Sequence, residues 1–156
     1  MKIATLAIIT RGNDVLLGLK RGGSEIGDGT LNGPGGKQEA GETILECLIR
    51  EVEEEVGVFV QPAMTEKVAI ILFHAGAVPD FEVHVYRAHK FVGEPRETES
   101  MIPAWYDIDN LPIDRMLESD RMWFPQLIRG ERFCANVYYQ ERAKGFLDIE
   151  FLPFAE

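Results

Sequence analysis

The stretch from Thr43 to Gly57 constrains the fold of this chain more than any other. Thr43, with Glu46 three residues later, forms a capping-box pattern that starts a helix, and Gly57 supplies the stop. Between them, apolar residues recur at helical spacing. These residues are Ile44, Leu45, Leu48, Ile49, Val52 and Val56. The sequence therefore predicts an amphipathic helix that packs one face against a core.

Three glutamates gather beside the apolar face of this helix. Glu51, Glu54 and Glu55 stand at positions i, i+3 and i+4, so they fall within an arc of roughly 100°, whereas Glu53 points away. Because like charges at this spacing destabilise an isolated helix, we expect positive charge beside them. Oxygen ligands in this number suit Mg²⁺, or Mn²⁺, better than zinc.

A glycine-rich loop, predicted from Lys20 to Gly36, precedes the helix and ends in Gly33-Pro34-Gly35-Gly36-Lys37. Glycines allow the backbone to approach a phosphate closely. For the glutamates alone, a solvated acidic face would be the better interpretation. The loop and the carboxylates together favour a metal and phosphate site.

The remaining pattern predicts an α+β or α/β sandwich and leaves the strand order open. The chain has no repeats and no Pro/Ser-rich linker, which predicts one domain over residues 1–156. A second helix is expected near Asp120–Arg129, around Pro125. The expected strands are Lys2–Thr10, Val15–Leu19, Val58–Gln61, Val68–His74, Phe81–Val92, Ala104–Asp107, Phe133–Gln140 and Gly145–Pro153.

Charge and composition exclude several classes of partner. A net charge of -10 argues against binding a nucleic-acid polymer, which needs a basic face, but not against a small nucleotide held through cations. No apolar stretch is long enough to span a bilayer, and the start of the chain is typical of a strand pair rather than a signal peptide. Cys47 and Cys134 form no disulfide framework, so we expect a cytoplasmic protein.

The segment from Gly36 to Val58, GKQEAGETILECLIREVEEEVGV, resembles the signature of the Nudix family at every fixed position. The matching positions are Gly36, Glu42, Arg50, Glu51, Val52, Glu54, Glu55, Gly57 and Val58. This resemblance implies an α/β fold, the Nudix-type α/β/α sandwich with a mixed sheet. It also implies hydrolysis of a nucleoside diphosphate linked to another moiety.

The resemblance implies roles for individual residues. Glu51, Glu54 and Glu55, with the Gly35 carbonyl, would hold the metal, and Glu51 or Glu54 would orient or deprotonate the attacking water. Arg50 would orient the glutamates and pair with Glu42. Either Glu97 or Glu99 would complete the metal site, since Ser100 stands where the family has a further glutamate.

A narrower resemblance, along nearly the whole chain, is to Nudix enzymes that hydrolyse oxidised purine nucleoside triphosphates. It rests on VLLGLK, NGPGGK, VHVY, the Met101–Trp105 segment, WFP and LDIEFLP, in this order. It implies that the substrate contacts Thr5, Lys20, Asn32, Gly35, Gly36, Lys37, Leu117, Ser119 and Asp120. Leu117 stands for a tryptophan that stacks on the base, and Ser119 for the first of two aspartates.

Three functions are compatible with these patterns. The first is a purine nucleoside triphosphate diphosphatase, acting as a monomer or homodimer. The second is a Nudix hydrolase of ADP-ribose, a dinucleoside polyphosphate or a pyrimidine nucleotide. The third is a Nudix module that binds a nucleotide without cutting it. The intact glutamates oppose the third, and Asn32 and Asp120 favour the first, because both can hydrogen-bond a purine edge.

Overall fold

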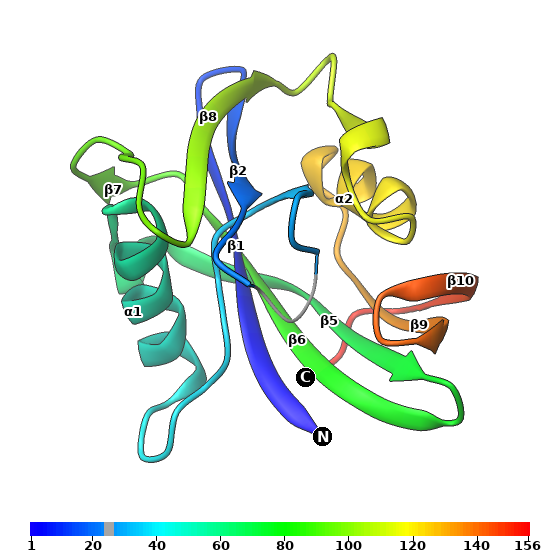
Figure 1. The fold of residues 1–156 in the computed structure, drawn as a ribbon. Coiled ribbons are helices and arrows are strands. Elements are labelled where there is room, and N and C mark those ends of the chain that lie inside the picture. Colours follow the sequence, from blue (N-terminus) through cyan, green and yellow to red (C-terminus); the bar gives the residue numbers. More distant parts are fainter. Residues whose placement is uncertain (24–26) are drawn as a thin grey trace.

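A mixed sheet forms the centre of the structure, a computed structural model that describes residues 1–23 and 27–156 (Figure 1). Its strand order is β10-β9-β5-β6-β1-β2-β3, and β8 also pairs with β2. The β1–β6 and β5–β9 pairs are parallel, and the other pairs are antiparallel. The strands are β1 (Lys2–Arg11), β2 (Asp14–Lys20), β3 (Leu31–Asn32), β5 (Thr65–Ala75), β6 (Val78–Ala88), β8 (Met101–Asp107), β9 (Phe133–Glu141) and β10 (Lys144–Leu152).

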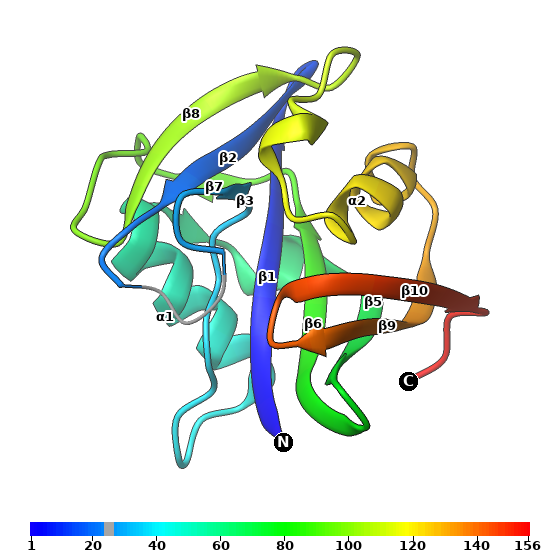
Figure 2. The ribbon, with the colours of Figure 1, turned by 45° about the vertical axis from the view of Figure 1, so that its right-hand side comes forward.

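The two helices cover opposite faces of this sheet (Figures 1 and 2). Helix α1 (Ile44–Val56) packs its buried side chains against Ala7 and Ile9 of β1. Helix α2 (Asp120–Ile128) packs against the core that contains Leu6 and Ile8. Because successive residues of a strand point to opposite faces, β1 contributes to both cores. The predicted α/β/α sandwich with a mixed sheet is confirmed.

The ends of α1 follow the predicted capping pattern. The Thr43 hydroxyl accepts the Glu46 backbone N–H at 3.1 Å, and the Glu46 carboxylate accepts the Thr43 backbone N–H at 2.8 Å. Gly57 closes the helix with a φ of 75°, a conformation that favours glycine. At 13 residues α1 is the longer α-helix, and no helix among the described residues has the length and apolar character to cross a membrane.

Several predicted boundaries differ from the structure. The strand expected over Phe81–Val92 is two strands, because the chain leaves β6 after Ala88 and forms β7 (Phe91–Val92), which pairs with β4 (Phe59–Val60). The segment predicted to be only a loop contains β3, paired with β2. Strand β8 begins at Met101 rather than Ala104. Short 3-10 turns, which were not predicted, span Pro62–Met64 and Ile113–Arg115.

Candidate active site

The glycine-rich segment lies directly against the backbone of β1. The Thr5 N–H donates to the Gly36 carbonyl at 2.9 Å, and the Ala7 N–H donates to the Pro34 carbonyl at 2.8 Å. A Cβ atom on Gly35 would overlap the Thr5 carbonyl, and one on Gly36 would overlap the carboxylate of Glu51. The two glycines therefore allow β1, the loop and α1 to meet at one point.

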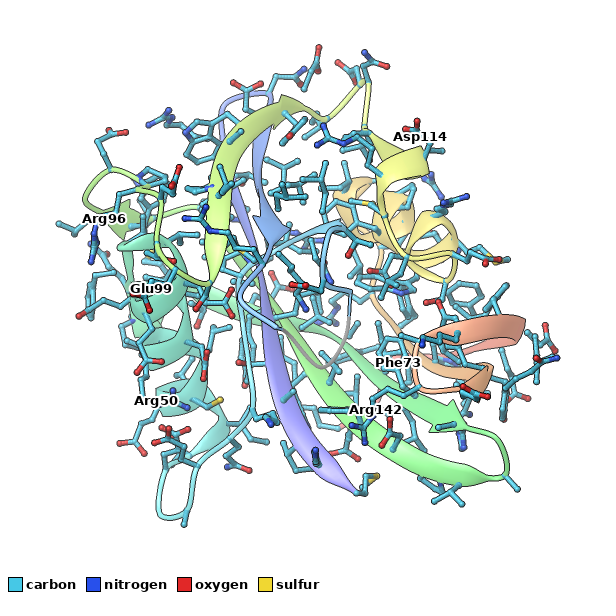
Figure 3. All side chains as sticks on the ribbon, viewed as in Figure 1. Arg50, Phe73, Arg96, Glu99, Asp114 and Arg142 are labelled. Carbon is cyan, nitrogen blue, oxygen red and sulfur yellow. The ribbon has the colours of Figure 1, made fainter. Side chains whose placement is uncertain are left out.

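Arg50, on α1 (Figure 3), binds the acidic residues around it. Its guanidinium donates to both oxygens of Glu42, at 2.6 and 3.0 Å, which is a bidentate pair. It also donates to Glu51 Oε1 at 2.7 Å, to Glu54 Oε2 at 3.1 Å and to the Lys37 carbonyl at 3.0 Å. The pairing with Glu42 and the contacts with both glutamates agree with the roles that the resemblance implied.

The carboxylates in this region have opposite electrostatic environments. The hydrogen bond from Arg50 lowers the pKa of Glu42 to about 2. Burial raises the pKa of Glu51 despite its contact with Arg50. Burial also raises the pKa of Glu55 to about 7; the two other glutamates add to this rise, and Lys20 opposes it. Negative charge at Glu51 and Glu55 is thus destabilised, as expected for partly buried carboxylates that lie close to one another.

This charge distribution fits a divalent cation. Carboxylate oxygens of Glu51, Glu54 and Glu55 are hard ligands, and Gly35 lines the same cavity as Glu51 and Glu55. Within the described part of the chain, however, no group of three His, Cys, Asp or Glu side chains is arranged so that it could hold a metal ion. Arg50 holds one oxygen each of Glu51 and Glu54, so the second oxygen of each carboxylate is the one that could bind an ion.

The two loop glutamates considered for this site have different surroundings. Glu97 accepts a hydrogen bond from Arg21 at 2.8 Å. Glu99 lies in the loop that precedes β8, beside α1 (Figure 3), and both side chains are exposed. Ser100, from the same loop, lines the cavity described below. Completion of the metal site by Glu97 or Glu99 stays a prediction.

A cavity of about 990 Å³ extends from this acidic region to helix α2. It falls in the range of typical small-molecule sites. Ten of the residues predicted to bind metal or substrate line it: Thr5, Lys20, Asn32, Gly35, Gly36, Lys37, Glu51, Glu55, Leu117 and Asp120. Arg50, Glu54 and Ser119 are not among the lining residues: Arg50 binds Glu54, whose side chain is exposed, and the buried Ser119 donates to Asp120.

Asp120 closes the end of the cavity opposite to the glutamates. It is 2% exposed, and burial raises its pKa from 3.8 to about 7, while a hydrogen bond from Ser119 and the charge of Lys20 act in the opposite direction. Among the described residues, its Oδ2 atom has no hydrogen-bond partner. The Trp123 indole N–H, which likewise has no partner at hydrogen-bond distance among the described residues, is close enough to Asp120 to oppose the rise of its pKa. Lys20 therefore acts on both ends of the cavity, at Glu55 and at Asp120.

Asn32 and Leu117 complete this end. The Asn32 side-chain oxygen accepts the Gly33 backbone N–H at 2.8 Å. Its amide NH₂ can donate to a ligand and its oxygen keeps a second lone pair, so both the donor and the acceptor predicted from the sequence are compatible with this position. Leu117 contributes an aliphatic side chain to the wall, at the position where the resemblance implied a tryptophan that stacks on the base.

The sequence analysis missed several residues of the cavity wall. Phe73 and Arg142, labelled in Figure 3, come from β5 and from the β9–β10 turn, and Phe81 comes from β6. The Arg142 guanidinium forms a bidentate pair with Asp80 at 2.6 and 2.7 Å and lies 5.2 Å from the Phe81 ring centre. These contacts join the two hairpins. No local pattern reveals them, because the pairing residues are 62 positions apart.

Fold and site together define an α/β/α protein with a carboxylate-bearing helix beside a large cavity, and comparison with known proteins identifies the family. The model of the NUDIX domain matches residues 1–127, so the chain belongs to the Nudix family of hydrolases. Members of this family act on small nucleotide substrates and generally need a divalent metal, usually Mg²⁺.

Two curated relatives are named oxidized purine nucleoside triphosphate hydrolase. The zebrafish (Danio rerio) protein is 38% identical over 140 residues, which covers 89% of this chain and 87% of the relative. The mouse (Mus musculus) protein is 35% identical over 142 residues, 90% and 88% of the two chains. The crystal structure of a MutT protein from Bacillus halodurans has the same fold, with a TM-score of 0.82 at 23% identity and 97% of each chain covered.

The first prediction concerns the carboxylates of α1. Glu54→Gln should lower turnover at least about 100-fold, by analogy with the removal of one preorganised transition-state stabiliser. The melting temperature should change little, because the Glu54 side chain is 59% exposed. The matched control is Glu53→Gln, the neighbouring exposed glutamate that points away from the site. Equal activity of the two variants would show that Glu54 has no role in the reaction.

The second prediction concerns the buried carboxyl of Asp120. Between about pH 4 and pH 7 the folded protein keeps its proton while the unfolded chain loses it, because the folded pKa is raised to about 7. The contribution of this group to the free energy of unfolding is therefore lost as the pH rises through that window. Asp120→Asn carries no such proton, so its stability relative to wild type should rise by up to roughly 4 kcal/mol between these pH values.

Urea denaturation at several pH values measures this difference, and other titrating groups cancel because both proteins share them. The control is Asp114→Asn, an exposed aspartate in the 3-10 turn before α2. A stability difference for Asp120→Asn that is independent of pH would contradict the raised pKa.

Proposed function

We propose that this protein hydrolyses purine nucleoside triphosphates, with oxidised purines such as 8-oxo-dGTP as preferred substrates, to the nucleoside monophosphate and pyrophosphate. The observation that carries the proposal is the single cavity that joins Glu51 and Glu55 at one end to Asn32 and Asp120 at the other. A purine nucleotide has its charge at one end and its hydrogen-bonding base at the other. The names of the zebrafish and mouse relatives support the same substrate class.

Residues at the two ends of the cavity have different roles in this proposal. Lys20 and Lys37, with the glycine backbone, would hold the phosphate chain, because both lysines line the cavity beside Glu51 and Glu55. Asn32 and Asp120 would hydrogen-bond the edge of the purine. Thr5 supports the loop through its backbone and its hydroxyl, which lies 3.4 Å from the Gly36 carbonyl.

The reaction that we propose is attack of water on the β-phosphorus. The water oxygen bonds to that phosphorus, and the bond to the oxygen bridging the α- and β-phosphates breaks, so the monophosphate leaves with the bridging oxygen. Glu51 or Glu54 accepts the proton of the water. Arg50, which contacts both carboxylates, holds them in position for this step.

We propose Mg²⁺ as the cofactor, with Mn²⁺ as a substitute, held by Glu51, Glu54, Glu55 and the Gly35 carbonyl. When bound, such an ion neutralises charge on phosphate oxygens and lowers the pKa of water. We also propose that residues 1–156 act as one cytoplasmic domain, as a monomer or homodimer. The free thiols of Cys47 and Cys134 suit a reducing compartment.

The third prediction concerns the substrate and the bond that is cut. With Mg²⁺ in ¹⁸O-water, dGTP or 8-oxo-dGTP should yield a monophosphate and a pyrophosphate, and mass spectrometry should find the label in the pyrophosphate. Label in the monophosphate would instead indicate attack at the α-phosphorus. Faster hydrolysis of ADP-ribose, a dinucleoside polyphosphate or a pyrimidine triphosphate would overturn the purine assignment.

The fourth prediction concerns the missing aromatic ring at position 117. Leu117 cannot stack on a base, so we expect weaker discrimination between 8-oxo-dGTP and dGTP than in the enzymes it resembles. In Leu117→Trp, stacking worth roughly 1–3 kcal/mol should lower KM for both purines by about 5-fold or more and sharpen the preference for 8-oxo-dGTP. Ile113→Trp, an exposed position in the preceding 3-10 turn, is the control. No change in KM would place the base elsewhere in the cavity.

A further inference from the structure

A chain of buried hydrogen bonds connects strand β9 to Asp120. The Tyr139 hydroxyl lies 2.9 Å from the Ser119 hydroxyl and 3.0 Å from the Ser119 backbone nitrogen. The Ser119 hydroxyl lies 3.2 Å from Asp120 Oδ1. All three residues are at most 2% exposed, so water does not compete with these contacts.

The chemistry of the groups gives this chain one direction. The Ser119 backbone N–H can only donate, so the Tyr139 oxygen accepts from it. The single Tyr139 proton is then donated to the Ser119 oxygen, which leaves the Ser119 proton for Asp120 Oδ1. Each hydroxyl donates one bond and accepts one, and such chains strengthen through mutual polarisation.

This chain of hydrogen bonds gives a partner to one oxygen of Asp120 and none to the other. Oδ1 accepts from Ser119, whereas Oδ2 is buried and has no partner within the described residues. An unsatisfied buried polar atom is costly, so Oδ2 favours a ligand that supplies a hydrogen-bond partner, an acceptor when the carboxyl is protonated and a donor when it is ionised. Because Asp120 lines the cavity, Oδ2 is the atom that can meet the ligand.

We propose that Tyr139 and Ser119 are positioning residues that determine base specificity, by holding Asp120 with Oδ2 presented to the edge of a purine. This inference rests on the proposed function for the identity of the ligand. In the enzymes that the chain resembles, an aspartate stands in place of Ser119. Here Ser119 supports a single carboxyl rather than offering a second one, and Tyr139 is 20 residues away in the sequence. Neither residue touches the reacting phosphate.

The test compares Tyr139→Phe, Ser119→Ala and the double variant. Tyr139→Phe removes only the hydroxyl, so the core contacts of the ring remain. Each single variant should raise KM for dGTP and the Kd of the product dGMP by roughly 2- to 10-fold, the range of one intramolecular hydrogen bond. The value of kcat should stay within about 2-fold of the wild-type value, since neither variant changes the glutamates of α1 or the residues proposed to hold the phosphate chain. Calorimetric titration with dGMP needs no hydrolysis.

Two further measurements separate positioning from a general structural effect. The double variant should match the weaker-binding single variant, because both changes break one chain. In an Asp120→Asn background, Tyr139→Phe should add less to the Kd of dGMP than it does in the wild type. Tyr138→Phe is the matched control, since its ring stacks on His74 outside the chain.

The outcomes are distinct. Unchanged dGMP binding in Tyr139→Phe and Ser119→Ala, or effects that multiply in the double variant, would overturn the inference. An equal effect of Tyr138→Phe would overturn it too. Suppose that the wild-type protein binds dGMP, that Tyr139→Phe and Ser119→Ala weaken this binding, and that dGTP and 8-oxo-dGTP are not hydrolysed. This result would overturn the proposed function and leave the inference standing.

Discussion

The site depends on direct backbone contact between β1 and the glycine-rich segment. Hydrogen bonds from Thr5 and Ala7 place this segment along the strand, and the lack of a Cβ at Gly35 and Gly36 permits the approach. The distance between loop and α1 follows from the same contact, because Gly36 adjoins the Glu51 carboxylate. Any side chain there would separate the glycine-rich segment from the carboxylates of α1, so the arrangement of the site depends on a steric constraint.

Two cationic side chains, Arg50 and Lys20, partly balance the negative charge of the carboxylates in the site. Arg50 binds Glu42 in a bidentate pair and contacts two of the proposed metal ligands, so it fixes their positions from outside the cavity. Lys20 lines the cavity and acts on Glu55 and on Asp120. A phosphate chain would therefore approach carboxylates whose negative charge is only partly balanced, which is the situation that divalent cations resolve.

The base end of the cavity is assembled from parts that are distant in the sequence. Asn32 comes from β3, Asp120 from the start of α2 and Tyr139 from β9. The parallel pairing of β5 with β9 brings Tyr139 beneath α2, where its hydroxyl reaches Ser119. Under the proposed function, base specificity therefore depends on how the β9–β10 hairpin is placed against the helix, whereas the proposed phosphate-binding end depends on one continuous segment.

That difference explains what the sequence by itself determined. The helix from Thr43 to Gly57, its glutamates, the glycines before it and the Nudix assignment could all be predicted, because capping, helical periodicity and the family signature are local properties of adjacent residues. The break between β6 and β7, the open Oδ2 of Asp120 and the contacts of Arg142 and Tyr139 could not. They arise where strands far apart in the chain pair, and only the tertiary structure decides which buried polar atoms then have partners.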